Sequence, residues 1–524
     1  MKRFFIPILC LMMAALGWHV AQTDAQDQCG VMDTVDYPVD TGVFQLAQAF
    51  GVPSPRHDGR YHTGEDWFIG RGATFDQPVR AIGRGVVTLS NPHAWGLDGG
   101  VVIIRHTLPD GATIYSQYGH LMESGSIQFP ARLDCVQAGE VIGVIGEARP
   151  APHLHFEIRV PSNVNQGIAD TPGPRYTAAD PRSLGWRHPS QMIRNLNARL
   201  HPAALWHSAT TTRPPAPPLV LNDNSLLVID GERLRRITRD GRVLWRVALT
   251  RRAVGLHGHA AQSFITYADG SIMRVDVESG GLSDGWRIDD FLPSAPPLIA
   301  ANSRIYHTAD NTLTALSLDQ REILWRTPDV PRYDRAIVTR QVIALVIGAE
   351  LWTLRASDGE RLGVAILADG AALAPHPDGG LIAYTRGGLW RVGVDGRWSL
   401  LHDTMRGGGE RHGVLLTGAG RLYTTDGAAL RAYGEDGVLL WESRLPSAMS
   451  GAITLETTGG IILAVSTHGH FAILHEGGGV CGAVALYGEG GRDVWYTLGD
   501  DAVLRVNVGD QLMGFDWERL ARGC

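Results

Sequence analysis

The strongest constraint on the fold is a short phrase that recurs in the C-terminal half of the chain. Its clearest copies, at 240–245, 320–325 and 436–441, follow or approximate the pattern D-G-x-x-L-W, and each ends in Leu-Trp. Short β-type runs separated by polar turns flank the copies, and their spacing corresponds to a unit of roughly 40 residues. A four-stranded propeller blade has this period. Residues 219–524 are therefore predicted to form a β-propeller of seven or eight blades.

The recurring tryptophans are expected to pack between blades and not to take part in catalysis. No set of residues in this half argues for a bound quinone, so an interaction platform is the favoured interpretation. Phrases such as 313–318, followed by Leu324 and Trp325, resemble the quinoprotein-dehydrogenase-like β-propellers, which include an outer-membrane assembly scaffold. This resemblance implies PQQ-like repeats and a protein partner for the propeller.

The composition changes at residues 187–218. Residues 191–200 are compatible with a short helix, and 210–218 read Thr-Thr-Thr-Arg-Pro-Pro-Ala-Pro-Pro, a stiff and extended linker. Upstream, residues 37–186 contain short β-type runs punctuated by glycine and little helical periodicity. This pattern predicts a compact all-β domain within residues 26–186. The whole chain is thus predicted to be all-β, with the domain boundary at 187–218.

The N-terminus has the pattern of a secretory signal. Lys2 and Arg3 precede the apolar run 4–16, and the small residues Thr23 and Ala25 fit a cleavage site. We expect residues 1–25 to be removed; an uncleaved membrane anchor is the alternative. No later apolar run is long enough to be a transmembrane helix. The periplasm is the expected location, with an extracellular one as the alternative.

Four cysteines follow the predicted signal: Cys29, Cys135, Cys481 and Cys524. An even number in an exported chain indicates disulfides, and none of the four has the C-x-x-C spacing of a metal site. The pairs Cys29–Cys135 and Cys481–Cys524 are favoured because each lies within one predicted domain. Buried free thiols are the alternative.

The charge of the chain excludes several functions. A net charge of −7 gives no reason to expect a nucleic-acid partner. The single lysine, Lys2, lies in the predicted signal. Schiff-base chemistry and a phosphate-binding loop that depends on lysine are therefore excluded.

Three histidines and an aspartate of the N-terminal half have the spacing of a metal centre. His153 and His155 stand on the same face of a predicted strand, because side chains alternate along a strand. His62 and Asp66 are separated by three residues that include a glycine, so both can reach one point. Imidazole and carboxylate are ordinary zinc ligands, and three of them leave a fourth position open, as in catalytic sites. We expect His62, Asp66 and His155 to be the ligands.

His153 would then be placed to exchange a proton, and His120 is the second candidate for proton transfer or for stabilising an oxyanion. H-x-x-x-D at 62–66, Y-G-H-L at 118–121 and H-L-H-F-E at 153–157, in that order, resemble the lysostaphin-type zinc endopeptidases over roughly residues 55–185. The resemblance implies that His62, Asp66 and His155 bind one Zn²⁺ per chain, that His120 and His153 are catalytic, and that peptidoglycan peptides are the substrate.

Other residues of these motifs have less defined roles. Glu65 is expected to lie beside the ligands or to be exposed, Glu157 to support His155, and His106 to be structural. The stretch 146–152 replaces a turn that is rich in serine or threonine and glycine in the family, which leaves the peptide specificity open. Two alternatives remain: a non-catalytic scaffold that activates another wall hydrolase, and a catalytic propeller with a targeting domain before it.

Overall fold

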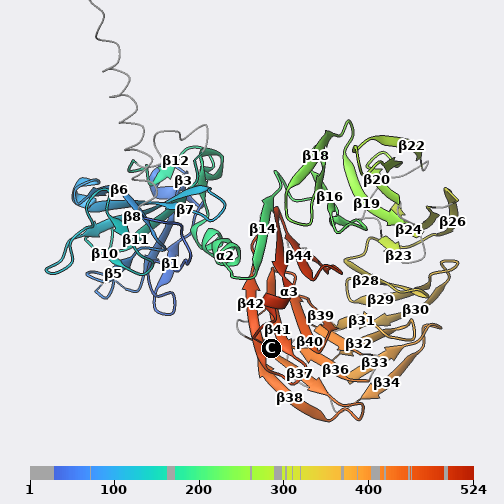
Figure 1. The fold of residues 1–524 in the computed structure, drawn as a ribbon. Coiled ribbons are helices and arrows are strands. Elements are labelled where there is room, and N and C mark those ends of the chain that lie inside the picture. Colours follow the sequence, from blue (N-terminus) through green and yellow to red (C-terminus); the bar gives the residue numbers. More distant parts are fainter. Residues whose placement is uncertain are drawn as a thin grey trace, which may run out of the picture. The chain divides into compact units, whose positions relative to one another are not determined.

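The computed structural model divides the chain into two compact units, Met1–His201 and Pro202–Cys524. It describes residues 29–523 except 71, 162–170, 260–261, 288–297, 301–303, 310, 319, 368–370, 386–387, 403–412, 418–419, 446–448, 450 and 489–493. The predicted signal, residues 1–25, lies outside the described residues. Figure 1 shows both units and labels many of their elements.

The first unit is built on a sheet of ten strands with the order β1-β4-β11-β8-β7-β6-β9; β10 pairs with β8 and β5, and β13 pairs with β11. The strands are β1 (Gln45–Gln48), β4 (Glu65–Phe68), β5 (Pro78–Arg80), β6 (Gly85–Asn91), β7 (Gly100–Thr107), β8 (Thr113–Met122), β9 (Cys135–Val136), β10 (Val141–Ile145), β11 (Leu154–Arg159) and β13 (Trp186–Arg187). A smaller sheet contains β2 (Pro53–Ser54), β3 (Arg60–His62) and β12 (Tyr176–Thr177). Helix α2 (Pro189–Arg199) follows.

Strand β11 shows why the sheet forms where it does. Leu154, Phe156 and Ile158 alternate along the strand and are fully buried in the core of the unit. Ile193 and Leu196, three residues apart on α2, join the same core, as expected for one face of a helix. Burial of each such side chain contributes about 1.5–3 kcal/mol. The opposite face of β11 is thereby left for the polar residues between them.

A buried polar chain crosses the core beside this sheet. His106 Nδ1 lies 2.8 Å from Arg84 O, which as a carbonyl can only accept, so the proton of the neutral ring is on Nδ1. Nε2 then accepts from the Ser116 hydroxyl at 2.7 Å, and Ser116 Oγ lies 3.0 Å from the Tyr118 hydroxyl. Burial lowers the pKa of His106 to about 4. The ring is neutral and holds strands together, which fits the expected structural role.

Disulfides are present in both units. Cys29 and Cys135 form the predicted bond, which ties the start of the described chain to β9. Cys481 is also disulfide-bonded. Its expected partner, Cys524, lies outside the described residues.

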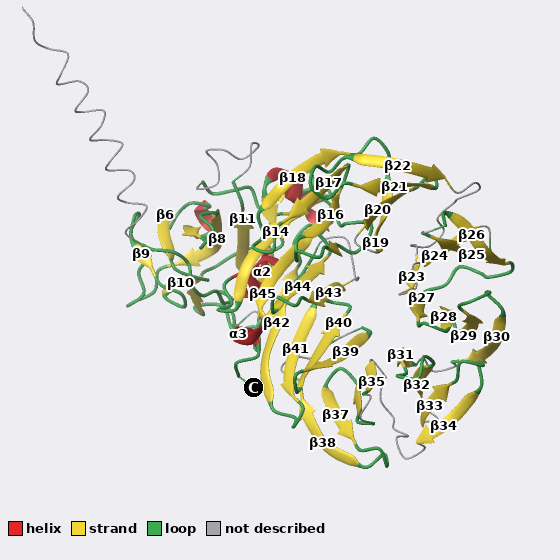
Figure 2. Cartoon of the chain, turned by 45° about the vertical axis from the view of Figure 1, so that its right-hand side comes forward, coloured by secondary structure: helices red, strands yellow, loops and turns green. Residues whose placement is uncertain are grey.

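The second unit consists of eight four-stranded antiparallel sheets within the described residues, arranged around a ring (Figure 2). In chain order they are β15 (Leu219–Val220), β16 (Leu226–Asp230), β17 (Arg233–Ile237) and β18 (Val243–Ala248); β19 (Ala253–His259), β20 (Gln262–Tyr267), β21 (Ser271–Val275) and β22 (Leu282–Arg287); β23 (Leu298–Ala300), β24 (Arg304–Ala309), β25 (Thr312–Ser317) and β26 (Glu322–Thr327); β27 (Arg335–Val338), β28 (Val342–Ile347), β29 (Glu350–Arg355) and β30 (Arg361–Ile366); β31 (Ala372–Pro375), β32 (Leu381–Thr385), β33 (Gly388–Val392) and β34 (Trp398–His402); β35 (Gly413–Leu416), β36 (Leu422–Thr425), β37 (Ala429–Tyr433) and β38 (Leu439–Arg444); β39 (Ile453–Thr458), β40 (Ile461–Ser466), β41 (His470–His475) and β42 (Val480–Ala485); and β43 (Val494–Leu498), β44 (Val503–Val508), β45 (Gln511–Asp516) and β14 (Ala204–Ala209). A one-turn helix, α3 (Trp517–Leu520), follows β45. The all-β propeller is confirmed, with eight blades.

The repeated tryptophans join neighbouring blades. Trp245 on β18 donates from Nε1 to Val277 O of the next blade at 3.0 Å, and Trp441 on β38 donates to Glu476 O at 2.9 Å. A Cβ added to Gly478, whose φ is +94°, would lie 2.9 Å from the Trp441 ring. Each indole thus covers a glycine turn of the following blade, as the expected packing role requires.

The predicted linker at 187–218 contains the last residue of β13, all of helix α2 and all of strand β14. Helix α2 corresponds to the helix expected at 191–200, whereas β14 (Ala204–Ala209) pairs with β45 in the eighth blade. The propeller therefore includes residues before the expected start at Leu219. Strand β14 has its partner some three hundred residues away, and so the local sequence carries no sign of the pairing. No helix in the described ranges is long and apolar enough to cross a bilayer.

Candidate metal centre

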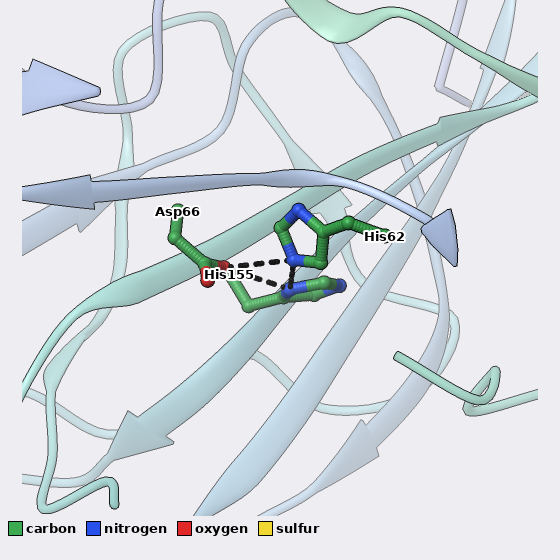
Figure 3. Close-up of side chains that lie close together, drawn as sticks. All are labelled: His62, Asp66 and His155. Atoms are coloured by element: carbon green, nitrogen blue, oxygen red, sulfur yellow. Dashed lines mark hydrogen bonds and ion pairs between the residues drawn. The ribbon is translucent and has the colours of Figure 1, made fainter. Parts of the chain in front are cut away.

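Three side chains predicted to be ligands meet at one point of the first unit. His62 ends β3, Asp66 lies on β4, and His155 lies on β11 directly opposite Asp66 in the antiparallel pair. His155 Nδ1 is 2.9 Å and His62 Nε2 is 3.2 Å from Asp66 Oδ1. The two nitrogens are 3.1 Å apart (Figure 3). All three residues are buried.

The second nitrogen of each ring determines what the first one can do. His62 Nδ1 faces Ala49 O at 3.2 Å, and His155 Nε2 faces Glu157 Oε1 at 2.9 Å. Both of these oxygens only accept, so each neutral ring carries its proton on the outer nitrogen. The inner nitrogens then point lone pairs at each other and at the Asp66 carboxylate. Such an arrangement requires a cation, either a proton or a metal ion, between the three groups.

The pKa shifts at the centre have the same origin. Burial alone would lower the pKa of His155, but hydrogen bonds to Asp66 and Glu157 outweigh burial and raise it to about 9. Burial opposes ionisation of Asp66, yet hydrogen bonds from His155 and His62 hold the pKa of that carboxyl well below its usual range. The centre thus retains a proton when no metal replaces it. This donor set, two imidazoles and one carboxylate, fits a zinc ion with one open position.

Gly64 allows the motif loop to approach β11. A Cβ at this position would lie 2.4 Å from Phe156 O and 3.0 Å from His155 Nε2. Any larger residue would push the loop away from the strand. The glycine in H-x-x-x-D therefore has a steric reason to be there.

Glu157 holds the His155 ring in place. Its carboxylate is fully buried and also accepts from the Thr63 hydroxyl at 2.7 Å, from Trp186 Nε1 at 2.7 Å and from Arg159 Nε at 2.9 Å. Burial opposes its ionisation, but the charge of Arg159 and the His155 bond lower the pKa of Glu157 to about 2. The residue expected to support His155 is thus the acceptor that sets which nitrogen of that ring is free.

Glu65 is fully buried, which excludes the second of the two expected placements, an exposed position. Its carboxylate accepts from Ser190 Oγ at 2.6 Å and Ser190 N at 3.2 Å, and His188 Nδ1 lies 2.9 Å from Oε1. These contacts fasten the start of α2 to β4, the strand that carries Asp66. Successive residues of β4 therefore face the helix and the metal centre in turn.

The two remaining histidines lie next to each other beside the centre. The rings of His120 and His153 have centroids 4.5 Å apart. His120 Nδ1 lies 2.7 Å from Asp98 O, and His153 Nδ1 lies 2.8 Å from Ala151 O, so the neutral forms of both rings offer a lone pair on Nε2. His153 Nε2 is 3.7 Å from Asp66 Oδ2. The structure therefore brings all five predicted site residues together.

Trp95 is a neighbour of the site that no sequence motif indicates. Its ring centroid lies 5.0 Å from that of His120 and 5.6 Å from that of His155. Gly119 makes room for it, because a Cβ there would lie 2.1 Å from the indole. Burial and the charges of neighbouring histidines lower the pKa of His120 to about 3. The sequence reveals the glycine of Y-G-H-L but not the indole that it admits.

The two families that match this chain fall in different units, one before His201 and one from Pro202 onwards. Residues 60–167 match peptidase family M23, and this segment contains all five site residues. Residues 202–374 match the outer membrane protein assembly factor BamB. No curated protein matches the chain. The chain therefore combines a peptidase M23 domain with a BamB-like repeat region.

Several solved structures are similar to part of this chain at low sequence identity. BamB from Moraxella catarrhalis is 14% identical, with 60% of this chain and 99% of that chain covered and a TM-score of 0.42. The computationally designed protein Ika8 is 11% identical, with 60% of this chain and 98% of that chain covered and a TM-score of 0.44. Sqt1 from Saccharomyces cerevisiae is 10% identical, with 60% of this chain and 98% of that chain covered and a TM-score of 0.43.

Proposed function

We propose that this chain is an exported zinc-dependent endopeptidase that hydrolyses peptide bonds of peptidoglycan. The observation that carries the proposal is the convergence of His62, Asp66 and His155, whose donor atoms lie within 3.2 Å of one another with two lone pairs turned inward. The match of residues 60–167 to peptidase family M23 supports the same chemistry.

His62 Nε2, Asp66 Oδ1 and His155 Nδ1 would hold the zinc ion. When bound there, zinc would polarise a substrate carbonyl and lower the pKa of a water molecule at its open position. Ala49 O and Glu157 keep the two rings in the tautomers that such binding needs. The protein supplies this arrangement in advance, because Asp66, His155 and Glu157 lie on strands β4 and β11 of one sheet and His62 ends β3 of the other.

His153 and His120 are the proposed catalytic residues. Each ring has its Nδ1 proton committed to a backbone carbonyl, so only Nε2 can take a proton from an attacking water or return it to the leaving amine. His153 is partly exposed and near Asp66, which favours it for proton transfer. His120 is buried beside it and would steady the oxygen of the substrate carbonyl or share the proton.

Export and an interaction role for the propeller are part of the proposal. A disulfide within the peptidase unit fits an oxidising compartment, most simply the periplasm. The match of residues 202–374 to an assembly factor supports a protein partner on the propeller. The peptidase domain would run from Gln26 through α2, and the propeller from Pro202.

Two substitutions in the full-length protein test the site assignment. His155→Ala should abolish both zinc binding and release of peptide fragments from peptidoglycan, whereas His153→Ala should keep about one zinc per chain and lose turnover. The control His475→Ala, at an exposed propeller position, should change neither. A wild-type protein that takes up no zinc and leaves peptidoglycan intact would refute the proposal. Loss of zinc in His153→Ala would refute its role as a proton carrier.

A further inference from the structure

A hollow opens directly beside the metal centre. It has a volume of about 480 Å³, and its walls include Arg56, His57, Arg60, Trp95, Arg175 and Tyr176. The Tyr176 ring lies 5.2 Å from that of His62, and the Trp95 ring lies 5.6 Å from that of His155. Any group bound in the hollow is therefore next to the ligands.

The walls of this hollow carry an excess of positive charge. Arg56, Arg60 and Arg175 line it, with Asp58 as the only carboxylate among its described lining residues. In the part of the chain that the structure describes, neither Arg56 nor Arg60 has an ion pair, and both are exposed. Two guanidinium groups thus face the hollow without an internal partner.

Arg175 has a partner, but that partner is shared. Its NH2 lies 3.2 Å from Asp98 Oδ2, and Arg149 Nε lies 3.1 Å from Asp98 Oδ1. One carboxylate therefore serves two arginines and leaves a positive charge unbalanced at this edge of the hollow. Burial is the largest cause that lowers the pKa of His57, and the charge of Arg175 lowers this pKa further.

The aromatic walls hold Arg175 and His57 in place. The Arg175 guanidinium lies over the Trp95 ring, 5.3 Å from its centroid, and the His57 ring stacks on Tyr176 at 3.7 Å with an interplanar angle of 16°. Tyr176 on β12 is directly opposite His62 on β3. The hollow is thus fastened to the strand that carries a ligand, and the Arg175 charge is positioned before any substrate arrives.

We propose that this hollow binds a carboxylate of the substrate peptide and so positions a neighbouring peptide bond at the metal centre. Guanidinium groups recognise carboxylates through paired hydrogen bonds, and two unpaired arginines at one wall provide that recognition. The proposal rests on the proposed function and names its substrate class, a peptide with a free carboxylate close to the bond that is cleaved. Arg56, Arg60 and Arg175 are then specificity residues.

Peptidoglycan with and without free carboxylates tests the proposal. Treatment with carbodiimide and ammonium chloride converts carboxylates to neutral amides and leaves the backbone intact. The full-length double variant Arg56→Gln/Arg60→Gln is compared with wild type and with Arg80→Gln/Arg132→Gln, which removes two exposed arginines elsewhere on the unit. On untreated material the pocket variant should lose about tenfold in kcat/KM, mainly through KM. Amidation of the substrate should lower kcat/KM of wild type and of the control variant by a similar factor of about ten. It should lower kcat/KM of the pocket variant, Arg56→Gln/Arg60→Gln, only slightly further.

Binding of the metal-free protein gives a second readout that does not need turnover. After zinc removal with a chelator, wild type should sediment with untreated peptidoglycan about tenfold better than the pocket variant at low salt, and the difference should vanish on amidated material. Equal response of wild type and pocket variant to amidation, in both assays, would overturn the carboxylate hollow. If wild type binds untreated peptidoglycan as expected but cleaves none of it when loaded with zinc, the proposed endopeptidase activity is refuted and the proposed carboxylate site in the hollow is still supported.

Discussion

Glu157→Gln should move the ring proton of His155 from Nε2 to Nδ1, although none of the three predicted metal ligands is substituted. The Glu157 carboxylate accepts from His155 Nε2 and so keeps the His155 lone pair on Nδ1, the atom that faces His62 and Asp66. A glutamine offers one oxygen and one amide group in its place. Because Arg159 and Trp186 occupy the Oε2 side as donors, the glutamine oxygen is held there, and its amide group turns to His155.

An amide donor facing His155 Nε2 favours the opposite tautomer of the ring. The proton then sits on Nδ1 and must be displaced before zinc can bind, which should weaken zinc affinity by about 10–100-fold. The substitution also leaves Arg159, whose side chain is 2% exposed, without its counter-ion. Loss of one partner of a buried pair costs about 3–5 kcal/mol, and the lower end applies here because Arg159 also bonds Thr171 O.

Both effects can be measured in the full-length protein. Competition with a chromogenic chelator gives the zinc affinity, and amide hydrogen exchange of β11 in the metal-free protein gives the local stability. Glu65→Gln is the matched control, since Glu65 is equally buried but contacts His188 and Ser190; it should lower stability and keep zinc affinity. A Glu157→Gln variant that binds zinc as tightly as wild type would refute the tautomer argument.

Three further predictions concern the peptidase unit. The pKa of His106 is about 4 in the folded protein and near 6.5 in the unfolded chain, so the stability that its neutral ring contributes is complete above pH 7 and is lost as the pH falls from 6.5 towards 4. Urea unfolding should therefore give a free energy of unfolding about 2 kcal/mol lower at pH 5 than at pH 7. The His106→Gln variant should lose less stability over the same pH change. Reduction of the Cys29–Cys135 disulfide, whose residues are 106 apart, should lower the free energy of unfolding by about 4–5 kcal/mol, because the unfolded chain regains the entropy of an open loop. Urea unfolding with and without reductant measures this difference, and an unchanged urea midpoint would contradict the prediction. Gly64→Ala places a Cβ 2.4 Å from Phe156 O and should abolish zinc uptake in the same chelator assay, although no ligand is altered; normal uptake would mean that the loop can give way.

The metal centre could be predicted from the sequence because its spacing follows local geometry. His153 lies directly before β11 and His155 is the second residue of that strand, so the two-residue spacing brings both rings to the same site, and the glycine between His62 and Asp66 permits a tight approach. Those regularities act over a few residues and are visible in a linear chain. A propeller of seven or eight blades could be predicted for the same reason, because the Leu-Trp phrase is clear in three copies and fits a unit of roughly 40 residues.

Features that depend on distant contacts could not be predicted. Trp95 reaches the site through space that Gly119 leaves open, and Asp98 contributes a backbone carbonyl, which any residue could offer. The burial of Glu65 depends on α2, more than a hundred residues further along the chain. None of these contacts has a signature in residue type or spacing, and so the sequence showed the ligands but not their surroundings.

Closure of the last blade sets an order of events during synthesis. Strand β14 pairs with β45, and His207 on β14 bonds Gln511 on β45, 304 residues later. At about 5–20 residues per second, β14 emerges from the ribosome roughly 15–60 s before its partner. All strands of the first unit precede it, so that unit can finish folding while the ring is still an open arc with an unpaired edge. Until β45 is available, the edge of β14 with which it pairs has no partner, and an unpaired strand edge is a place where another chain can pair.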